Sequence, residues 1–539
     1  MERILYNGSI VTMERDSAEQ ELMEAPEAVL ISDGIIKAVG QLDVLEKVAG
    51  KNAVKQDLDG RCLMPAFIDT HSHIIMNGYM AGLADLTGCR SFDDITVTLR
   101  DFMLTHHLTE KDVLCGFGYD HNFLEEKAHP DKRVLDRVSR EIPVFILHIS
   151  AHLACANSKA FELAGIGSDT PDPDGGMIGR LPHGGEPSGY VEEAGMNALQ
   201  SVIMPRIKTN PVQLTQKMQE VYLKNGITTV QDGASTLADI KALLDISASG
   251  FLKLDVVSYP LMTGDGLEFA AGMKSCSGYK NRFRIGGYKL VLDGSPQGRS
   301  AWMSEPYLGG DGKYCGYPWM RDDEVLSHVR RAVAEGKQIL AHCNGDAASE
   351  QFIRAYEKAI ADIGCRRNLR PVMIHCQTVR NDQLDKMTKL NMIASVFVGH
   401  VWYWGDIHLM NLGAERGNHI SPIKDAIDRG ILVTFHQDTP VTKPDMLHSV
   451  WTAVNRMSQG GNRIGEDQAV GVYTALKAVT VNAAYQYFEE DSKGSIAKGK
   501  RADLVILDDS PLEADKMKIK DIKVLETIKD GETVFRERN

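Results

Sequence analysis

The stretch Leu63-Met64-Pro65-Ala66-Phe67-Ile68-Asp69-Thr70-His71-Ser72-His73 joins an apolar run to a polar end. Its first six residues are apolar, which is typical of a strand covered on both faces. In a strand, residues i and i+2 point to the same side, so His71 and His73 are expected to project together beyond the strand. An HxH pattern alone does not establish a metal site, so its significance depends on what accompanies it elsewhere in the chain.

Seven further apolar runs follow, which makes eight in total. Helix-patterned segments separate most of them, for example Asp323 to Glu335, Ala347 to Ile363 and Asp382 to Lys389. Alternation of strand and helix eight times over predicts an α/β protein with a (β/α)8, TIM-like barrel. The seven runs are Thr228 to Gln231, Leu254 to Tyr259, Ile285 to Leu292, Gln338 to Ala341, Pro371 to Ile374, Met392 to Phe397 and Ile431 to Phe435.

The interval between the first two runs is too long for one crossover helix. It holds another buried run, Val144 to His148, and a stretch rich in Pro, Gly and Asp at 170–190. We therefore predict a long insertion after barrel strand 1, at about residues 90–205.

Both ends of the chain carry short strand-like runs. Asn-Gly at 7–8 and Asp-Gly at 33–34 and 530–531 separate them in the manner of hairpin turns. We predict one small β-sandwich domain built from residues 1–59 and 493–539, with the barrel at 60–492. The runs are Ile4 to Tyr6, Ser9 to Met13, Ala28 to Ser32, Ile35 to Val39, Ala502 to Leu507, Ile522 to Thr527 and Thr533 to Arg536.

Composition excludes several classes of protein. Of 539 residues, 43% are hydrophobic and 25% charged, which is ordinary globular usage and excludes a disordered or fibrous chain. A net charge of −13 without a basic run argues against nucleic acid or an anionic membrane surface as partner. Nine cysteines without a CxxC pair, no signal-peptide pattern and no long apolar stretch predict a cytoplasmic protein without a membrane span.

Metal-ligand residue types gather at the ends of the apolar runs. Lys289 lies within the fourth run, His342 closes the fifth, His375 the sixth, and Asp438 follows the eighth. Singly, His342 or His375 would be read as a hydrogen-bonded core histidine and Lys289 as an ion-paired lysine. Together with the HxH pair they favour a metal centre, because imidazoles and a carboxylate at converging strand ends suit Zn²⁺.

At this point the chain resembles the amidohydrolase superfamily of metal-dependent hydrolases over nearly its whole length. The opening stretch is similar to the family's P-G-hydrophobic-I-D-x-H-x-H motif, with Ala66 where Gly is usual, and residues 494–505 resemble its return to the small sheet domain. Four stretches resemble the YtcJ-like branch, which includes N-substituted formamide deformylases: Lys289 to Ala301, His342 to Asp346, Leu412 to Ile423 and Thr434 to Val441.

The resemblance implies two divalent metal ions, with Zn²⁺ as the default. By the family's pattern, the more buried metal would be held by His71, His73 and Asp438, and the second by His342 and His375.

Carbamylated Lys289 would bridge both metals, since an ammonium group offers only donors whereas a carbamate is an anionic ligand. The metals would activate water as hydroxide, and Asp438 would pass its proton to the leaving nitrogen. If Lys289 is not carbamylated, the site would hold only one metal. His436 precedes the strand terminus, so we expect it to pack behind the ligands.

Substrate contacts are expected from the loops. In the insertion, Tyr119 and His152 belong to pieces similar to the branch's substrate-facing segments. Trp302 and the cluster at 402–404 could form an aromatic wall. Asp346 is a candidate for substrate contact or for orienting its loop, with a helix N-cap as the alternative.

The sequence thus predicts an amidohydrolase acting on carbon–nitrogen bonds other than peptide bonds, in a small N-acyl or N-formyl compound. Alternatives are a mononuclear aminohydrolase (a deaminase) or a cyclic-amide hydrolase and, in another class, a non-catalytic binding protein on a degenerate barrel. Every ligand position that the family's pattern expects is filled, which argues against a barrel that has lost its metal site. The expected partner is a small-molecule substrate. Members of the family are often dimers, so the sequence leaves open whether the chain forms a homo-oligomer.

Overall fold

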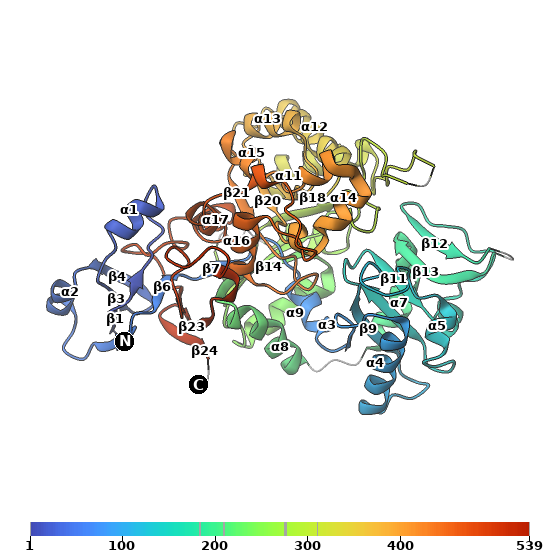
Figure 1. Ribbon diagram of the computed structural model, residues 1–539, viewed down its shortest axis with the longest axis horizontal. Helices are drawn as coiled ribbons and strands as arrows, with labels where there is room; N and C mark the ends of the chain where they lie inside the picture. The colour runs from blue at the N-terminus through green and yellow to red at the C-terminus, as the bar shows by residue number, and fades with distance from the viewer. Residues whose placement is uncertain (1, 183–184, 208–210, 274–277, 310, 538–539) are drawn as a thin grey trace.

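The computed structural model describes residues 2–182, 185–207, 211–273, 278–309 and 311–537. Three parts are visible side by side: a small sheet domain, a central part of parallel strands and helices, and an insertion (Figure 1). The extreme ends of the predicted sandwich segments, residues 183–184 of the predicted insertion, and Cys276 lie outside the described residues.

Two sheets made from both ends of the chain form the small domain. Their strand orders are β4-β3-β1-β5 and β2-β6-β22-β23-β24. Buried side chains from both ends, such as Leu5, Val29, Leu504 and Ile528, share one core. The strands are β1 (Glu2–Tyr6), β2 (Ser9–Ile10), β3 (Ala28–Ser32), β4 (Ile35–Gly40), β5 (Val54–Asp57), β6 (Cys62–Pro65), β22 (Leu504–Leu507), β23 (Val524–Lys529) and β24 (Glu532–Arg536), with helices α1 (Ala18–Met23) and α2 (Leu42–Val48).

Two local predictions for this domain need correction. The Asp-Gly pairs at 33–34 and 530–531 do lie between antiparallel strands, but the Asn-Gly pair at 7–8 does not. It leads from β1 in one sheet to β2 in the other, where a Cβ on Gly8 would lie 2.3 Å from the carbonyl oxygen of Arg61. The first apolar run is also divided, because β6 joins the small domain and only β7 (Phe67–Ile68) joins the central strands.

The central part contains the eight predicted runs as parallel strands. Two sheets carry them, in the orders β16-β15-β14-β7 and β17-β18-β19-β20-β21. The fourth run is shared between the sheets, since β16 pairs with β15 and β17 pairs with β18. The remaining strands are β14 (Ile227–Ser235), β15 (Asp255–Pro260), β16 (Phe283–Ile285), β17 (Gly287–Val291), β18 (Gln338–Cys343), β19 (Val372–His375), β20 (Ile393–Val396) and β21 (Val433–Phe435).

Helices follow the strands as predicted, which confirms the α/β alternation. They are α3 (Ile74–Met80), α8 (Pro211–Lys224), α9 (Leu237–Ala248), α10 (Gly266–Gly272), α11 (Asp322–Ala334), α12 (Asp346–Ile363), α13 (Asn381–Lys389), α14 (His400–Asn418), α15 (Ile423–Asp428), α16 (Met446–Asn455), α17 (Val472–Ala478) and α18 (Val481–Gln486). Over the described ranges no ladder joins β7 to β21, so closure into a full barrel stays a prediction.

A six-stranded sheet forms the insertion, on the right of Figure 1, in the order β12-β13-β11-β10-β9-β8. Helices cover it, and its core is separate from that of the central part. Its elements are β8 (Ala84–Asp85), α4 (Phe92–Thr105), β9 (Leu114–Tyr119), α5 (Lys132–Asp136), β10 (Val144–His148), β11 (Leu153–Ala156), α6 (Ser158–Ala164), β12 (Gly176–Arg180), β13 (Pro187–Glu193) and α7 (Asn197–Ile203).

Among the described residues, none of the helices has both the length and the apolar character needed to cross a membrane. The eight cysteines described are all free thiols.

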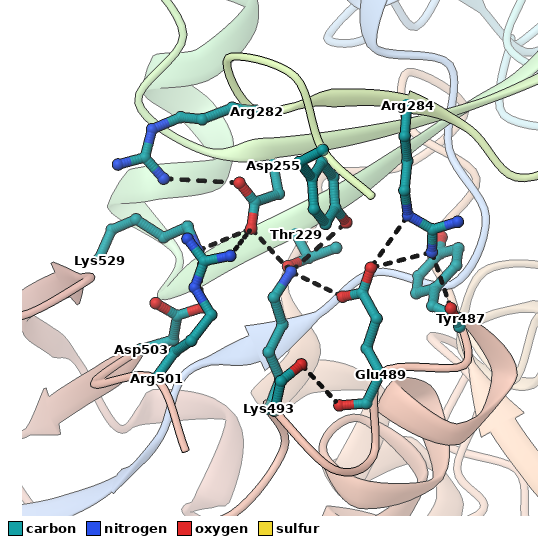
Figure 2. Close-up of polar contacts among 12 residues, drawn as sticks. Thr229, Asp255, Arg282, Arg284, Tyr487, Glu489, Lys493, Arg501, Asp503 and Lys529 are labelled. Atoms are coloured by element: carbon teal, nitrogen blue, oxygen red, sulfur yellow. Dashed lines mark hydrogen bonds and ion pairs between the residues drawn. The ribbon is translucent and has the colours of Figure 1, made fainter. Parts of the chain in front are cut away.

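A buried ion cluster ties the small domain to the amino-terminal end of the central strands (Figure 2). Asp255, the first residue of β15, is 1% exposed, and its Oδ2 lies 2.7 Å from the Nζ atoms of both Lys493 and Lys529. Lys493 also pairs with Glu489, and Lys529 with Asp503, each at 2.7 Å. Because Lys529 ends β23 of the small domain, these charges are buried at the junction of the two parts.

We expect Asp255→Asn to destabilise the chain by about 3–5 kcal/mol, because it leaves two buried ammonium groups short of a partner. Urea unfolding followed by circular dichroism measures the change. Asp43→Asn is the control, since Asp43 pairs with Lys47 on the exposed face of α2 and should leave the midpoint unchanged. Equal midpoints for both variants would contradict a structural role for the cluster.

Candidate metal centre

All six predicted ligands meet at the carboxyl ends of the central strands. Lys289 is 1% exposed, and His71 and the histidines on β18 and β19 are also buried. They come from separate elements: His71 and His73 follow β7, Lys289 lies in β17, His342 in β18, His375 ends β19, and Asp438 follows β21.

His71, His73 and Asp438 form a compact trio of ligand atoms. Oδ1 of Asp438 lies 3.4 Å from Nε2 of His71 and 3.3 Å from Nε2 of His73. Two ligands of a tetrahedral Zn²⁺, each at about 2.0–2.1 Å from the ion, lie about 3.3–3.4 Å apart. The trio therefore has the spacing of three ligands around one cation.

The remaining ligands adjoin this trio. Oδ2 of Asp438 lies 3.9 Å from Nε2 of His375, and the rings of His375 and His342 have centroids 4.4 Å apart. Nζ of Lys289 lies 3.2 Å from Nε2 of His71. Asp438 thus reaches both the HxH pair and the histidines of β18 and β19.

Acceptors behind three of the histidines determine which ring nitrogen carries the hydrogen. Nδ1 of His71 lies 2.6 Å from Oε1 of Gln231, and Nδ1 of His73 lies 2.7 Å from the carbonyl oxygen of Gly233. Nδ1 of His342 lies 3.0 Å from Oδ1 of Asp293. Since these oxygens only accept, each Nδ1 donates and each Nε2 keeps a lone pair, as a metal ligand requires.

A chain of hydrogen bonds also places the ring hydrogen of His375 on Nδ1 and leaves a lone pair on its Nε2. Oγ1 of Thr70 donates to the carbonyl oxygen of Phe435 at 3.0 Å and accepts from Oγ of Ser395 at 3.1 Å. Ser395 in turn accepts from Nδ1 of His436 at 2.9 Å, so Nε2 of His436 accepts from Nδ1 of His375 at 3.1 Å. The prediction that His436 packs behind the ligands is thereby confirmed.

Two buried atoms of the cluster have no hydrogen-bond partner: Nε2 of His375 and Oδ1 of Asp438. Lone pairs that face one another without an intervening hydrogen repel, and a buried acceptor without a partner costs about 1–3 kcal/mol. Cations bound at these two atoms would remove both penalties, so the donor set fits divalent metal ions.

Burial sets the protonation of the cluster. It lowers the pKa of His71, His342 and His375, which keeps these imidazoles neutral. Burial also lowers the pKa of Lys289 to about 7. The backbone at His375 and Asp438 adopts φ angles of 79° and 54°, a left-handed conformation that residues with a Cβ adopt rarely.

Two substrate-contact candidates lie elsewhere. Tyr119 is fully buried in the core of the insertion, and its hydroxyl contacts His129 and Cys155, so it faces away from the cluster. Asp346 is the first residue of α12, behind the N-cap Gly345, and its carboxylate accepts from Ser304 and pairs with Arg380. Asp346 therefore orients its loop.

The predicted aromatic wall is mostly core. Trp402 packs against Trp451 and His448, and Trp404 is buried with its Nε1 donating to Asp120 at 2.9 Å. Trp302 is half-buried and packs against the central core. His152, by contrast, lies beside the cluster, with its ring centroid 5.2 Å from that of His342.

A second trio of metal-ligand types, Asp120, His121 and His148, lies in the insertion. Nδ1 of His148 accepts from the backbone N–H of Ser150 at 3.1 Å, which places the ring hydrogen on Nε2, the atom that faces Asp120. Oδ1 of Asp120 also accepts two hydrogen bonds of 2.9 Å from Asn122. Hydrogen bonds satisfy this trio, and it is not arranged to bind a metal.

Four residues near the cluster escaped sequence reasoning: Gln231, Asp293, Glu193 and Trp319. Asp293 was detectable, since a carboxylate after a strand is a common partner of a ligating histidine. It accepts from Nδ1 of His342 and from the backbone N–H groups of Trp302, Asn344 and Gly345. Nothing in the local sequence marks the other three.

The family model described as "Amidohydrolase family" matches residues 56–535. The chain belongs to the amidohydrolase family. This membership confirms the prediction of a hydrolase acting on carbon–nitrogen bonds other than peptide bonds.

Relatives of known name agree with the predicted branch. The putative amidohydrolase YtcJ of Bacillus subtilis is 28% identical and covers 99% of both chains. The N-substituted formamide deformylase of Arthrobacter pascens is 26% identical over 98% of this chain and 97% of its own. An uncharacterized metal-dependent hydrolase from Pyrococcus horikoshii OT3 has a solved structure, with a TM-score of 0.77, 26% identity, and coverage of 96% and 99%.

We expect Gln231→Leu to weaken metal binding about 10–100-fold, because His71 loses the acceptor that orients it. Competition with a fluorescent chelator measures the affinity. Gln351→Leu is the control, since Gln351 is also buried but bonds to Met320 and Asp322 away from the cluster. Unchanged affinity in Gln231→Leu would contradict the assigned tautomer.

We expect His121→Gln to leave the metal content of this amidohydrolase unchanged, because the trio in the insertion is satisfied by hydrogen bonds. Elemental analysis of the purified variant and of the wild type checks this. A loss of one equivalent of metal would show that the trio is a metal site.

Proposed function

We propose that this chain hydrolyses a non-peptide C–N bond in a small N-acyl or N-formyl compound. One observation carries the proposal: imidazoles and Asp438 direct lone pairs into one buried space beside Lys289, and two of these atoms, Nε2 of His375 and Oδ1 of Asp438, have no hydrogen-bond partner. Similarity to an N-substituted formamide deformylase over nearly the whole chain supports the substrate class.

The proposed cofactor is a pair of divalent metal ions, with Zn²⁺ as the default for an imidazole-rich site. The ligands would be His71, His73, His342, His375, Asp438 and Lys289. When bound, the metals would supply water activated near neutral pH and an electrophile for the scissile carbonyl.

Lys289 is proposed to be carbamylated and to bridge the metals. Its buried Nζ forms no ion pair with any carboxylate of the described residues, although an isolated buried ammonium is costly. An anionic carbamate between two cations would remove that cost. This arrangement favours two metals over the mononuclear alternative.

Asp438 is proposed to move the proton. Its Oδ1 faces His71 and His73 and its Oδ2 faces His375, so the carboxylate lies between the two groups of ligands. From there it would accept the proton of the attacking water and deliver it to the leaving nitrogen.

We also propose that the eight central strands close into a (β/α)8 barrel. The bond from Oγ1 of Thr70 to the carbonyl oxygen of Phe435 joins the segments after β7 and in β21, which supports closure. Free cysteines throughout the described residues support a reducing, cytoplasmic environment.

A panel of N-formyl and N-acetyl amines with aliphatic and aromatic substituents tests the function. We expect release of formate or acetate by the wild type, and a kcat at least about 10³-fold lower for Asp438→Asn, because the amide cannot accept the proton. An enzymatic formate or acetate assay detects the product.

Metal analysis of Lys289→Ala belongs to the same experiment. The proposal expects two metals per wild-type chain and one or none in the variant. One metal in both, with ammonia released from ring amines and no acid from the panel, would favour a deaminase. Absence of retained metal would favour a binding protein.

A further inference from the structure

The insertion places one imidazole next to the metal centre. His152 follows β10, and its ring lies 5.2 Å from that of His342 and 6.2 Å from that of Trp319, measured between centroids. The side chain is 18% exposed, so part of the ring surface is open to solvent.

Glu193 fixes this ring from behind. Nδ1 of His152 lies 2.9 Å from Oε2 of Glu193, and the backbone N–H of Glu193 donates to the carbonyl oxygen of His152, also at 2.9 Å. Because Nδ1 is engaged, Nε2 is the ring nitrogen left for a ligand.

The conformation of Glu193 is costly. Its side chain is 0% exposed, and Oε1 has no hydrogen-bond partner. Its φ and ψ are 51° and −125°, outside the regions that residues with a Cβ favour. Oε1 also approaches the loop after β17 so closely that a Cβ on Gly294 would lie 2.1 Å away. A carboxylate that is at once buried, strained and half-satisfied is therefore a candidate for a functional position.

The neighbouring Glu192 shows what a structural carboxylate looks like here. Its Oε2 accepts from the hydroxyl of Tyr190 at 2.7 Å, and its Oε1 from that of Tyr317 at 3.1 Å. Both oxygens are satisfied. In the described part of the chain, the ion pair of Glu193 is with His152 alone.

We infer that Glu193 is a positioning residue that holds His152 so that its Nε2, which keeps the lone pair because Nδ1 donates to Glu193, accepts a hydrogen bond from the substrate's amide N–H beside the metal centre. The inference rests on the proposed function. It assigns to the insertion a part in substrate recognition: His152, from the segment after β10, makes the contact, and Glu193, at the end of β13, holds it.

Steady-state kinetics of four variants test the inference on any amide of the panel that the wild type hydrolyses. Glu193→Gln and His152→Gln should each lower kcat/KM about 10–100-fold, whereas the control Glu192→Gln stays within about twofold. The double variant Glu193→Gln/His152→Gln should lose no more than His152→Gln alone, because Glu193 acts through His152. Additive losses would mean that Glu193 has only a structural role.

Binding of acetohydroxamate, measured by calorimetry on metal-loaded protein, gives a readout that needs no substrate. Glu193→Gln and His152→Gln should weaken it at least fivefold at unchanged metal content, with Glu192→Gln like the wild type. Weaker binding in these two variants supports the inference even if the wild type hydrolyses no amide of the panel. In that event only the proposed function fails. Wild-type affinity in both variants overturns the inference.

If Glu193→Gln does not fold, His152→Gln and Glu193→Asp decide the question. Weaker hydroxamate binding in both supports the inference, and wild-type binding in His152→Gln overturns it. A wild-type protein that retains no metal overturns the inference together with the proposed function.

Discussion

The site depends on the direction of a few hydrogen bonds behind its histidines. Gln231, Gly233 and Asp293 offer only acceptors to the Nδ1 atoms of His71, His73 and His342. The chain from the carbonyl oxygen of Phe435 through Thr70, Ser395 and His436 imposes the same tautomer on His375. All four Nε2 atoms therefore carry lone pairs. The arrangement therefore suits a cation. At His148, by contrast, Nδ1 accepts a hydrogen bond and Nε2 carries the hydrogen.

A second constraint acts at the other end of the strands. Asp255 at the start of β15 binds lysines from the small domain and from the segment after α18. A buried cluster of this kind stabilises only when every charge is paired, so it fixes how the small domain meets the strands. The strands in turn carry the candidate ligands at their carboxyl ends, while the insertion reaches the same end and places His152 beside them.

The sequence predicted what periodicity and residue type control. The eight strands follow from the apolar runs, and the helices α11, α12 and α13 follow from the helical pattern between the runs. The convergence of the six candidate ligands follows from their positions in or directly after five of these runs. Sequence reasoning failed where tertiary contacts determine the position or the partner of a residue. Tyr119 sits in a strand whose faces are both covered, and the Asn-Gly pair at 7–8 connects two sheets. Gln231 and Glu193 become partners of His71 and His152 only through folding, since each is distant in sequence from the ring that it orients.

Anomalous X-ray diffraction at the zinc edge, on crystals of protein purified without chelators, tests the central claim most directly. The account predicts one peak among His71, His73 and Asp438, a second beside His342 and His375, and extra density on Nζ of Lys289 between them. A metal-loaded crystal with no peak at these residues, or with its peak at Asp120, His121 and His148, would contradict it.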